Sequence, residues 1–317
     1  MLILACLPIG DSRDASANLI QSIQQVQYVA AEDSRKFARL CQDLNIKHNA
    51  KVISFFEGNE SEKIEELTNL LKSQKDVLVA TDAGAPGISD PGYRLIRAAL
   101  QSNVEIKVLP GPSAVTTALL LSGLPTDRFC FEGFPPRTQG ARAKWFEELA
   151  QQERTVIFFE APHRITECLV DAGAAFGLDR NGAICREMSK HYEEVVRGNL
   201  AELIEWAKSK DILGELTIVI EGFDPGSREF DQADLILPMD LTNRANILNA
   251  ARNDADKAKV FMLRSFDPSL SHINPTSREA EQLQVPDPWG ETIEAYQEVL
   301  EMIESATDGL ITTVLQR

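Results

Sequence analysis

The sequence predicts an α/β protein in which parallel sheets are covered by helices. Short apolar runs rich in β-branched residues alternate, along most of the 317 residues, with longer segments whose apolar residues recur at helical spacing. Such an alternation is typical of parallel strands joined by helical crossovers. With 44% hydrophobic residues, a chain of this length can form two or three domains with sizeable cores.

The strands are expected at the apolar runs, most of which end next to Gly, Pro or a charged residue. These runs are residues 2–7, 27–31, 51–56, 76–80, 104–109, 128–134, 154–160, 182–187 and 215–222. The helices between them include amphipathic segments at residues 59–74, 92–101, 141–152 and 199–210. Asn199 stands where an N-cap residue is expected for the last of these.

A break in composition divides the chain after the last strong strand. Residues 222–232 are rich in Gly, Pro and Asp, as linkers are. We therefore predict an N-terminal α/β domain at residues 1–115, a second α/β domain at 116–223, a linker at 224–233 and a small α/β extension at 234–317. In the extension, strands are expected at 234–240 and 258–266, and a terminal helix near 291–306.

The net charge of −16 opposes nucleic-acid binding, because phosphate contacts depend on Lys and Arg. An RNA-binding function would require a local basic patch that faces the ligand cleft. The candidates for such a patch are Arg128, Arg137, Arg142, Lys144, Arg164 and Lys190.

The five cysteines are odd in number and form no C-x-x-C pair, which argues against a disulfide framework and against a zinc site. No H-E-x-x-H spacing suggests another metal. No apolar run approaches the roughly 20 residues of a membrane helix, and residues 1–10 show no basic leader. We therefore expect a cytoplasmic protein without a metal site.

Three loops at the ends of predicted strands combine glycine with proline: residues 7–11, 80–94 and 109–114. Each can be an ordinary turn, but ligands of open α/β sheets gather outside the carboxyl ends of the strands, and glycine lets backbone approach them closely. Neither G-x-G-x-x-G nor G-x-x-x-x-G-K-[ST] occurs. Asp82 and Asp90 with no lysine in these loops favour a cationic ligand, although Asp90 could instead cap the helix that begins near Pro91.

Charged residues gather at further strand ends and could supply a general base. The segments 30–36 and 186–194 carry such groups, but they can equally be a helix start with acids in its first turn and a solvated charged loop. Residues 134–145 could contact phosphate and stack a base, or could simply lead into a helix.

Taken together, these segments resemble the tetrapyrrole-methylase superfamily, and within it the branch of 16S rRNA ribose 2′-O-methyltransferases. The resemblance covers residues 1–223. It rests on PIGD at 8–11, AEDSRK at 31–36, EGNE at 57–60, DAGAPGISDPGYRL at 82–95, PGPSAV at 110–115, SGLPTDRFCFEGFPPR at 122–137, EAPHR at 160–164, REMSKHYEEVVRG at 186–198 and GELTIVIEG at 214–222. The sequence differs from the family at Leu7 and Asp11, where threonine and asparagine are usual.

The resemblance implies a two-domain class III methyltransferase fold that binds S-adenosylmethionine in the cleft between its domains. It also implies a homodimer that methylates the 2′-hydroxyl of a cytidine in 16S rRNA of the small ribosomal subunit, and no role at membranes or on DNA. The implied cofactor contacts are Pro8, Ile9, Gly10, Asp82, Ala83, Gly84, Ser113, Ala114, Glu215, Leu216 and Thr217. The implied catalytic residues are Glu32, Asp33, Arg35, Glu160, His163 and Lys190, and the substrate is expected at Phe134, Arg137, Arg142, Lys144, Arg164 and Arg186.

The tail resembles the second half of a low-molecular-weight protein tyrosine phosphatase, through residues 234–243, 259–268 and 285–304. That chemistry needs a cysteine thiolate in a C-x-x-x-x-x-R loop, with an aspartate as general acid. Asp287 matches the acid, but no C-x-x-x-x-x-R occurs in the chain. Phosphatase activity is therefore not expected, and the tail is an acidic remnant, a module that pairs with a partner's sheet, or a partly unfolded segment.

Two other functions remain open on the sequence alone. One is methylation of a small acceptor such as a corrin precursor, although the segments 132–137 and 186–194 favour RNA. The other is a non-catalytic ribosome-binding or adaptor protein, suggested by the phosphatase-like tail.

Overall fold

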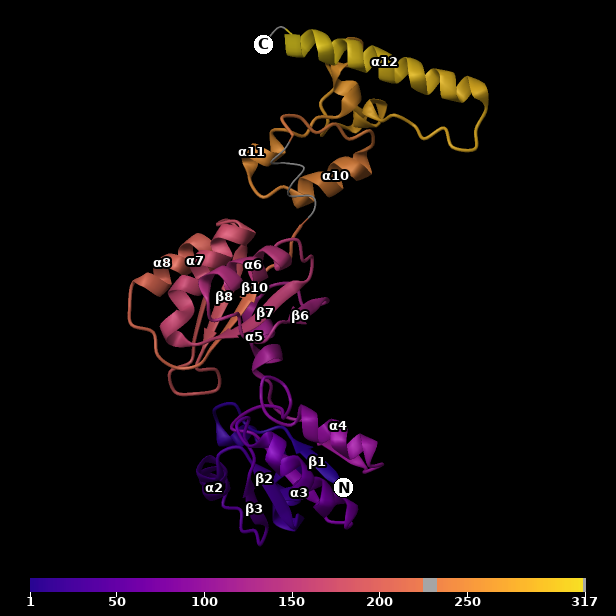
Figure 1. Cartoon of the computed structure of the whole chain (residues 1–317). Helices are drawn as coiled ribbons and strands as arrows, with labels where there is room; N and C mark the ends of the chain where they lie inside the picture. Colours follow the sequence, from indigo (N-terminus) through magenta and orange to yellow (C-terminus); the bar gives the residue numbers. More distant parts are fainter. Residues whose placement is uncertain (225–232, 316–317) are drawn as a thin grey trace. The chain divides into compact units, whose positions relative to one another are not determined.

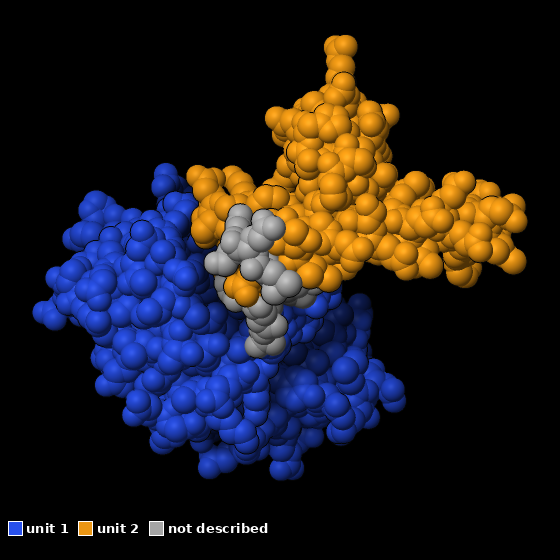
Figure 2. All heavy atoms as spheres, turned by 90° about the horizontal axis from the view of Figure 1, so that it is seen from above, with its two compact units in different colours: residues 1–223 blue, residues 224–317 orange. Residues whose placement is uncertain are grey.

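The computed structural model describes residues 1–224 and 233–315, and the chain divides into two compact units, residues 1–223 and 224–317 (Figures 1 and 2). The predicted linker, residues 224–233, lies outside the described residues for its positions 225–232. No helix among the described residues has both the length and the apolar character needed to cross a membrane.

The first sheet of unit 1 is parallel throughout, with the strand order β3-β2-β4-β1-β5. Its central strands are buried because helices cover both faces. One core cluster joins α1 and α2 to the sheet, and another joins α3 and α4 to it. The elements are β1 (Leu2–Ala5), α1 (Ala17–Gln25), β2 (Tyr28–Ala31), α2 (Ser34–Asp43), β3 (Lys51–Ser54), α3 (Glu60–Lys72), β4 (Val77–Ala80), α4 (Tyr93–Gln101) and β5 (Ile106–Leu109), with a short 3-10 turn at Ser12–Asp14.

The second sheet is mixed, with the order β6-β7-β10-β8-β9. Its bounds are β6 (Phe129–Phe131), β7 (Thr155–Glu160), β8 (Asn181–Arg186), β9 (Glu194–Asn199) and β10 (Leu216–Ile220). Only β6 and β7 are parallel, so the expectation of parallel sheets throughout was wrong for this half. The reason is local: the short loop 187–193 joins β8 to β9, and β10 inserts antiparallel between β7 and β8.

Helices cover both faces of the second sheet as well. On one face α6 (Gln139–Leu149), α7 (Ile165–Phe176) and α8 (Leu200–Lys208) contribute to the largest core cluster, and α5 (Ala114–Ser122) packs on the other face, where Ile9 joins it. A 3-10 turn at Pro162–Arg164 precedes α7. The predicted N-cap of α8 is confirmed, because Asn199 and Glu202 form a reciprocal capping box.

Unit 2 is mainly helical, with α10 (Leu241–Ala250), α11 (Asp254–Lys257), α12 (Ile293–Leu315) and 3-10 turns at Leu263–Phe266 and Arg278–Leu283. The C-terminal extension is present, but the two strands expected in it reduce to one isolated parallel bridge between Ile236 and Val260. Two small apolar clusters, around Met262 and Leu263, hold the unit together. Two strands without neighbours need a large apolar core to be stable, and clusters of this size bury too little surface to provide one.

Candidate functional site

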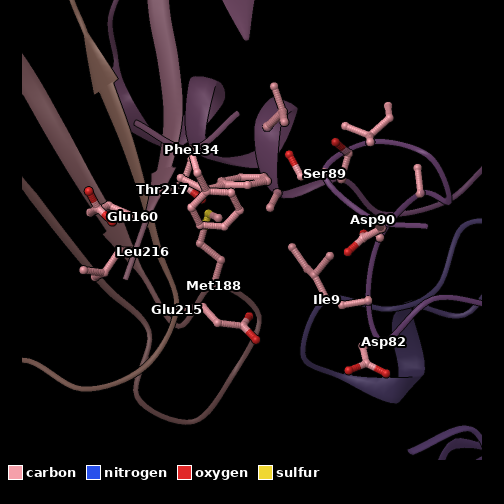
Figure 3. A pocket seen from close by; sticks show the side chains of 18 of the residues that line it. Ile9, Asp82, Ser89, Asp90, Phe134, Glu160, Met188, Glu215, Leu216 and Thr217 are labelled. Carbon is pink, nitrogen blue, oxygen red and sulfur yellow. The ribbon is translucent and has the colours of Figure 1, made fainter. Parts of the chain in front are cut away.

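A cleft of about 400 Å³ lies between the loops of the first sheet and the strand ends of the second (Figure 3). Ile9, Asp82 and Asp90 belong to the first side, and Glu160, Leu216 and Thr217 to the second. The residues that line it are Ile9, Glu32, Lys36, 82–85, 88–90, 113–115, Phe134, 159–162, Met188 and 214–217. The three Gly/Pro loops of the sequence therefore meet at one cavity, as ligand-binding loops at strand ends do.

Topology explains why these loops converge. β1, β4 and β5 are adjacent and parallel, so the segments that follow their carboxyl ends reach the same edge of the sheet. Leu7 and Gly84 add a backbone bridge between the first two of these loops, and Gly84 adopts a φ of 66° there. Opposite them, β10 begins at Leu216, beside the end of β7 at Glu160, because these strands are antiparallel.

The first side of the cleft is strongly acidic. The Glu32 carboxylate accepts a hydrogen bond of 3.0 Å from the backbone N–H of Asp82, and Asp82 Oδ1 is buried without a hydrogen-bond partner among the described residues. Burial raises the pKa of Glu32, although the N–H of Asp82 acts in the opposite direction. Burial, with the charges of Glu32, Asp82 and Glu215, raises the pKa of Asp90 from 3.8 to about 7. The cavity is thus short of positive charge.

One cation does lie in the cleft, although the Gly/Pro loops themselves contain no lysine: Lys36 of α2 reaches it. Lys36 Nζ lies 2.6 Å from Asp82 Oδ2. The hydrogen bond to Asp82 raises the pKa of Lys36, so this lysine remains charged. Its ammonium occupies the place at Asp82 that a cationic ligand would also seek.

Asp90 gives the stability of unit 1 a pH dependence. Its pKa is higher in the folded protein than in the unfolded chain, so between pH 3.8 and about 7 the folded state binds the extra proton. Stability from this group is therefore present at low pH and lost as the pH rises through about 7. Asp90→Asn should match the wild type in urea unfolding near pH 3.5, below the unfolded pKa, and be more stable near pH 8. A constant difference across this range would contradict the shift.

The loop 187–193 closes one end of the cleft against the first loop of the chain. Met188 lines the cavity, while the hydroxyl oxygen of Ser189 accepts a 3.1 Å hydrogen bond from the N–H of Asp11, and the hydroxyl donates to Asp14. Glu187 and Ser189 both have positive φ, an unusual backbone for residues with a side chain. Contacts with the first loop thus hold this segment in a tight conformation.

Gly10 is required by that packing. A Cβ at this position would lie 2.4 Å from the carbonyl oxygen of Ser189. Gly10→Ala should lower the free energy of unfolding by roughly 1–3 kcal/mol, because backbone atoms must move apart. Gly140→Ala is the control, since a Cβ there meets nothing within 4 Å and lies in α6. If thermal melts show equal effects of the two substitutions, the loops do not press on each other at Gly10.

The residues predicted to be catalytic are not all brought together. Glu32 and Glu160 line the cleft. Asp33 instead caps α2 and pairs with Arg35, whose side chain is 90% exposed, so the helix-start interpretation holds for this pair. His163 is exposed in the 3-10 turn before α7 and does not line the cavity.

Lys190 lies at the edge of the site between two carboxylates, 3.0 Å from Glu187 and 2.9 Å from Glu215. Burial would lower the pKa of this lysine, but the two hydrogen-bonded carboxylates outweigh burial and raise it. A charged lysine cannot accept a proton. Its contact with Glu215 positions the segment that leads into β10.

Among the predicted substrate residues, Phe134 lines the cleft with 55% of its surface exposed, and its ring packs edge-on against Phe159. Arg137 and Lys144 are exposed. Arg186 forms an ion pair with Glu194. Arg164 donates hydrogen bonds to Glu160 and to the carbonyls of Pro135 and Pro136, so it stabilises the segment next to Phe134.

Arg142 must be withdrawn as a substrate contact. It is 1% exposed, and its Nε lies 2.7 Å from Asp171 Oδ2. The sequence shows four basic residues between positions 128 and 144, but it does not show that one of them, Arg142, faces the interior from α6. The predicted basic patch therefore loses Arg142, and Arg164 and Lys190 enter it already paired with carboxylates.

Of the predicted cofactor contacts, all but Pro8 and Gly10 line the cavity. Sequence reasoning did not select Lys36, Met188 and Phe159, although all three line it. Lys36 lay within the quoted AEDSRK segment and Met188 within REMSKHYEE, so their segments carried a signal. Asp90 was considered as a helix cap, but α4 begins at Tyr93, its N-cap residue is Gly92, and the Gly92 N–H donates a 3.1 Å hydrogen bond to Glu60 and not to Asp90.

Comparison with known proteins identifies the family of unit 1 and a separate match for the C-terminal residues. Residues 220–317 match the model of the low molecular weight phosphotyrosine protein phosphatases. Relatives named "Ribosomal RNA small subunit methyltransferase I" include one from Mycobacterium tuberculosis, 47% identical over 71% of this chain and 78% of the relative, and one from Thermotoga maritima, 38% identical over 70% and 98%. The solved methyltransferase CobJ is 15% identical, with a TM-score of 0.55 over 70% of this chain and 93% of its own, and supports the fold. Residues 1–204 match the model of the tetrapyrrole (corrin/porphyrin) methylases, and the chain belongs to that family.

Proposed function

We propose that this protein transfers the methyl group of S-adenosylmethionine to the 2′-hydroxyl of a cytidine in 16S rRNA of the small ribosomal subunit. The observation that carries the proposal is the 47% identity to a relative named as a ribosomal RNA small subunit methyltransferase, over 224 residues. That length corresponds to unit 1, which contains both sheets and the cleft.

The charge of the cleft supports a cationic methyl donor. Glu32, Asp82 and Asp90 outnumber Lys36 in the lining, so the partly enclosed cavity keeps a negative potential, and electrostatic attraction there is stronger than in water. The lining segments 82–84, 113–114 and 215–217, together with Ile9, would hold the donor between them. When bound, S-adenosylmethionine supplies an electrophilic methyl group on a sulfonium.

The protein's own residues contribute chiefly by positioning the donor and the acceptor and by accepting one proton. The target hydroxyl must lose its proton during the transfer, and a group with a pKa near the working pH accepts it best. Glu32 and Asp90 are the cleft carboxylates with raised pKa values, and both face the cavity. Either can take this proton, and separate Glu32→Gln and Asp90→Asn variants distinguish them by their pH–rate profiles.

RNA would meet the cleft at its rim. Phe134 offers an exposed ring for stacking a base, and Phe159 fixes its orientation. Arg137 and Lys144 are exposed cations, and the ion pair of Lys144 with Glu148 is a weak surface contact at 4.0 Å, so both side chains can turn to phosphate. A chain with a net charge of −16 has to concentrate positive charge locally, and this favours weak, salt-sensitive contacts within an assembled subunit. A homodimer, as the resemblance implied, belongs to the same proposal.

The decisive experiment is methyl transfer from labelled S-adenosylmethionine to small ribosomal subunits that lack the modification, followed by mapping of the labelled nucleotide. Label at the 2′-oxygen of a 16S rRNA cytidine is expected. Label on a corrin precursor but not on the subunit would favour the small-acceptor alternative. Failure to bind S-adenosylmethionine in calorimetry would leave only the adaptor alternative.

A further inference from the structure

The terminal helix α12 carries an apolar surface that unit 2 does not cover. Its inner side, including Val299, Ile303 and Ala306, packs into the cluster around Leu263. Other apolar residues point away: Ile293 is 74% exposed, Leu300 54% and Ile311 50%. At 3.6 residues per turn, spacings of seven and eighteen residues place these three on one side of the helix. They form what we call the outer stripe of α12, the yellow helix in Figure 1, in which the exposed Glu304 lies between Leu300 and Ile311.

Two aromatic residues extend this surface at the start of the helix. Tyr296 is 47% exposed and lies one turn beyond Ile293. Trp289, in the segment just before the helix, is 86% exposed. Exposed aromatic residues next to aliphatic ones are the composition of interface anchors rather than of ordinary protein surface.

Acidic residues run alongside the stripe. Glu294 and Glu301 each follow a stripe residue by one position, about 100° around the helix, and Asp308 continues the row seven residues later. All three are exposed, and none forms an ion pair within the part of the chain that the structure describes. From residue 293 to residue 315 the sequence contains no Lys, Arg or His. The negative row therefore has no counter-charge on its own helix.

This combination selects one kind of occupant. A second copy of α12 would bring acidic rows together, which costs free energy when the interface loses water. A membrane surface carries anionic headgroups and would repel the same row. A helix with an apolar face flanked by Lys or Arg satisfies both features, since it buries the stripe and pairs with the acids.

We propose that the outer stripe of α12 and its acidic row form a docking surface for a basic amphipathic helix of a partner protein. The proposal concerns unit 2 alone and does not depend on the chemistry of the cleft. It also gives the phosphatase-like tail, which lacks a C-x-x-x-x-x-R loop, a binding role in place of a catalytic one.

The test uses the full-length protein and a fluorescein-labelled 18-residue peptide of Leu and Lys, arranged so that one helical face is apolar. Fluorescence anisotropy in 150 mM salt should show saturable binding, and a peptide of the same composition in scrambled order should bind at least tenfold more weakly. Equal binding of the two peptides would mean that only net charge is recognised, and would overturn the proposal.

Two sets of variants locate the binding. Ile293→Ser with Leu300→Ser leaves the charge unchanged and should weaken binding at least tenfold. Leu213→Ser with Leu178→Ser changes two leucines of unit 1 with nearly the same exposed fractions, 73% and 53%, and should have no effect. Glu294→Gln, Glu301→Gln and Asp308→Asn together should weaken binding several-fold and flatten its salt dependence. The matched control, Glu62→Gln, Glu65→Gln and Asp43→Asn, removes the same charge from unit 1. Circular dichroism checks that each variant is folded.

Two further measurements address the competing occupants. In sedimentation, the wild type and the Ile293→Ser, Leu300→Ser variant should have the same oligomeric state. Vesicles rich in phosphatidylglycerol should bind neither protein through the stripe. Stripe-dependent self-association or vesicle binding would assign the surface to a second copy or to a lipid surface instead. Unchanged peptide binding in the stripe variant would overturn the proposal outright.

Discussion

Replacing Asp171 by alanine is expected to destabilise unit 1 by about 3–5 kcal/mol, because it leaves the Arg142 guanidinium buried without its main partner. Arg142 is 1% exposed, and its Nε lies 2.7 Å from the Asp171 carboxylate. The second acid within reach, Glu167, lies 3.5 Å away and has a 79% exposed side chain, so it cannot compensate fully. Urea unfolding followed by circular dichroism measures the loss.

The control is a pair on the surface of the same helix. Lys144 and Glu148 lie 4.0 Å apart with both side chains largely exposed, and Glu148→Ala should cost less than about 1 kcal/mol. Replacing both buried partners, as in Arg142→Met with Asp171→Leu, should restore most of the stability, since apolar side chains of similar volume can take the place of a buried ion pair.

The double variant also settles the role of Arg142. Because this arginine is structural, the folded double variant should bind rRNA as the wild type does. A folded double variant with normal stability and strongly reduced RNA affinity would show that Arg142 leaves its buried position to contact the substrate.

Asp82→Asn is expected to weaken binding of S-adenosylmethionine by about tenfold or more, equivalent to about 1–2 kcal/mol, because it removes a charge from a partly enclosed cavity. Binding of S-adenosylhomocysteine, which lacks the sulfonium charge, should weaken much less. Isothermal titration calorimetry of both ligands against the wild type and the variant measures the difference. Asp43→Asn, at the exposed end of α2, provides the control for the loss of one acid.

Lys36 sharpens this test. In the ligand-free cleft it neutralises Asp82 at 2.6 Å, so a cationic donor has to compete with its ammonium. Lys36→Met should therefore strengthen S-adenosylmethionine binding a few-fold and leave S-adenosylhomocysteine nearly unaffected. If Asp82→Asn weakened both ligands equally, Asp82 would recognise a group that they share and not the sulfonium.

How far the sequence predicted the molecule depended on the range of the interaction involved. The capping of α8 by Asn199 was predictable because the cap involves residues three positions apart. The meeting of the Gly/Pro loops followed from the parallel order of strands. The pairing of Lys36 with Asp82 joins residues 46 positions apart, and no local pattern indicates it.

Two other features depended on context that a sequence pattern does not contain. The composition around Arg142 was that of a basic surface segment, and only the packing of α6 on α7 turns this side chain toward Asp171. In unit 2 the apolar runs at 234–240 and 258–266 have the residues of strands. Strands need neighbours, and within the described residues these two share a single bridge.

The central position of β10 has a consequence for the order in which the protein can fold during synthesis. β10 is the last strand of unit 1 in the chain, yet it lies between β7 and β8 and begins with residues of the cleft wall. At typical rates of translation, the 34 residues that separate Arg186 from Ile220 take roughly 2–7 seconds to synthesise. During that time the first sheet can already form, while β7 and β8 each lack their neighbouring strand β10. A nascent chain that stops before Leu216 would thus hold a completed first sheet but no cleft, and its unpaired strand edges would be open to aggregation.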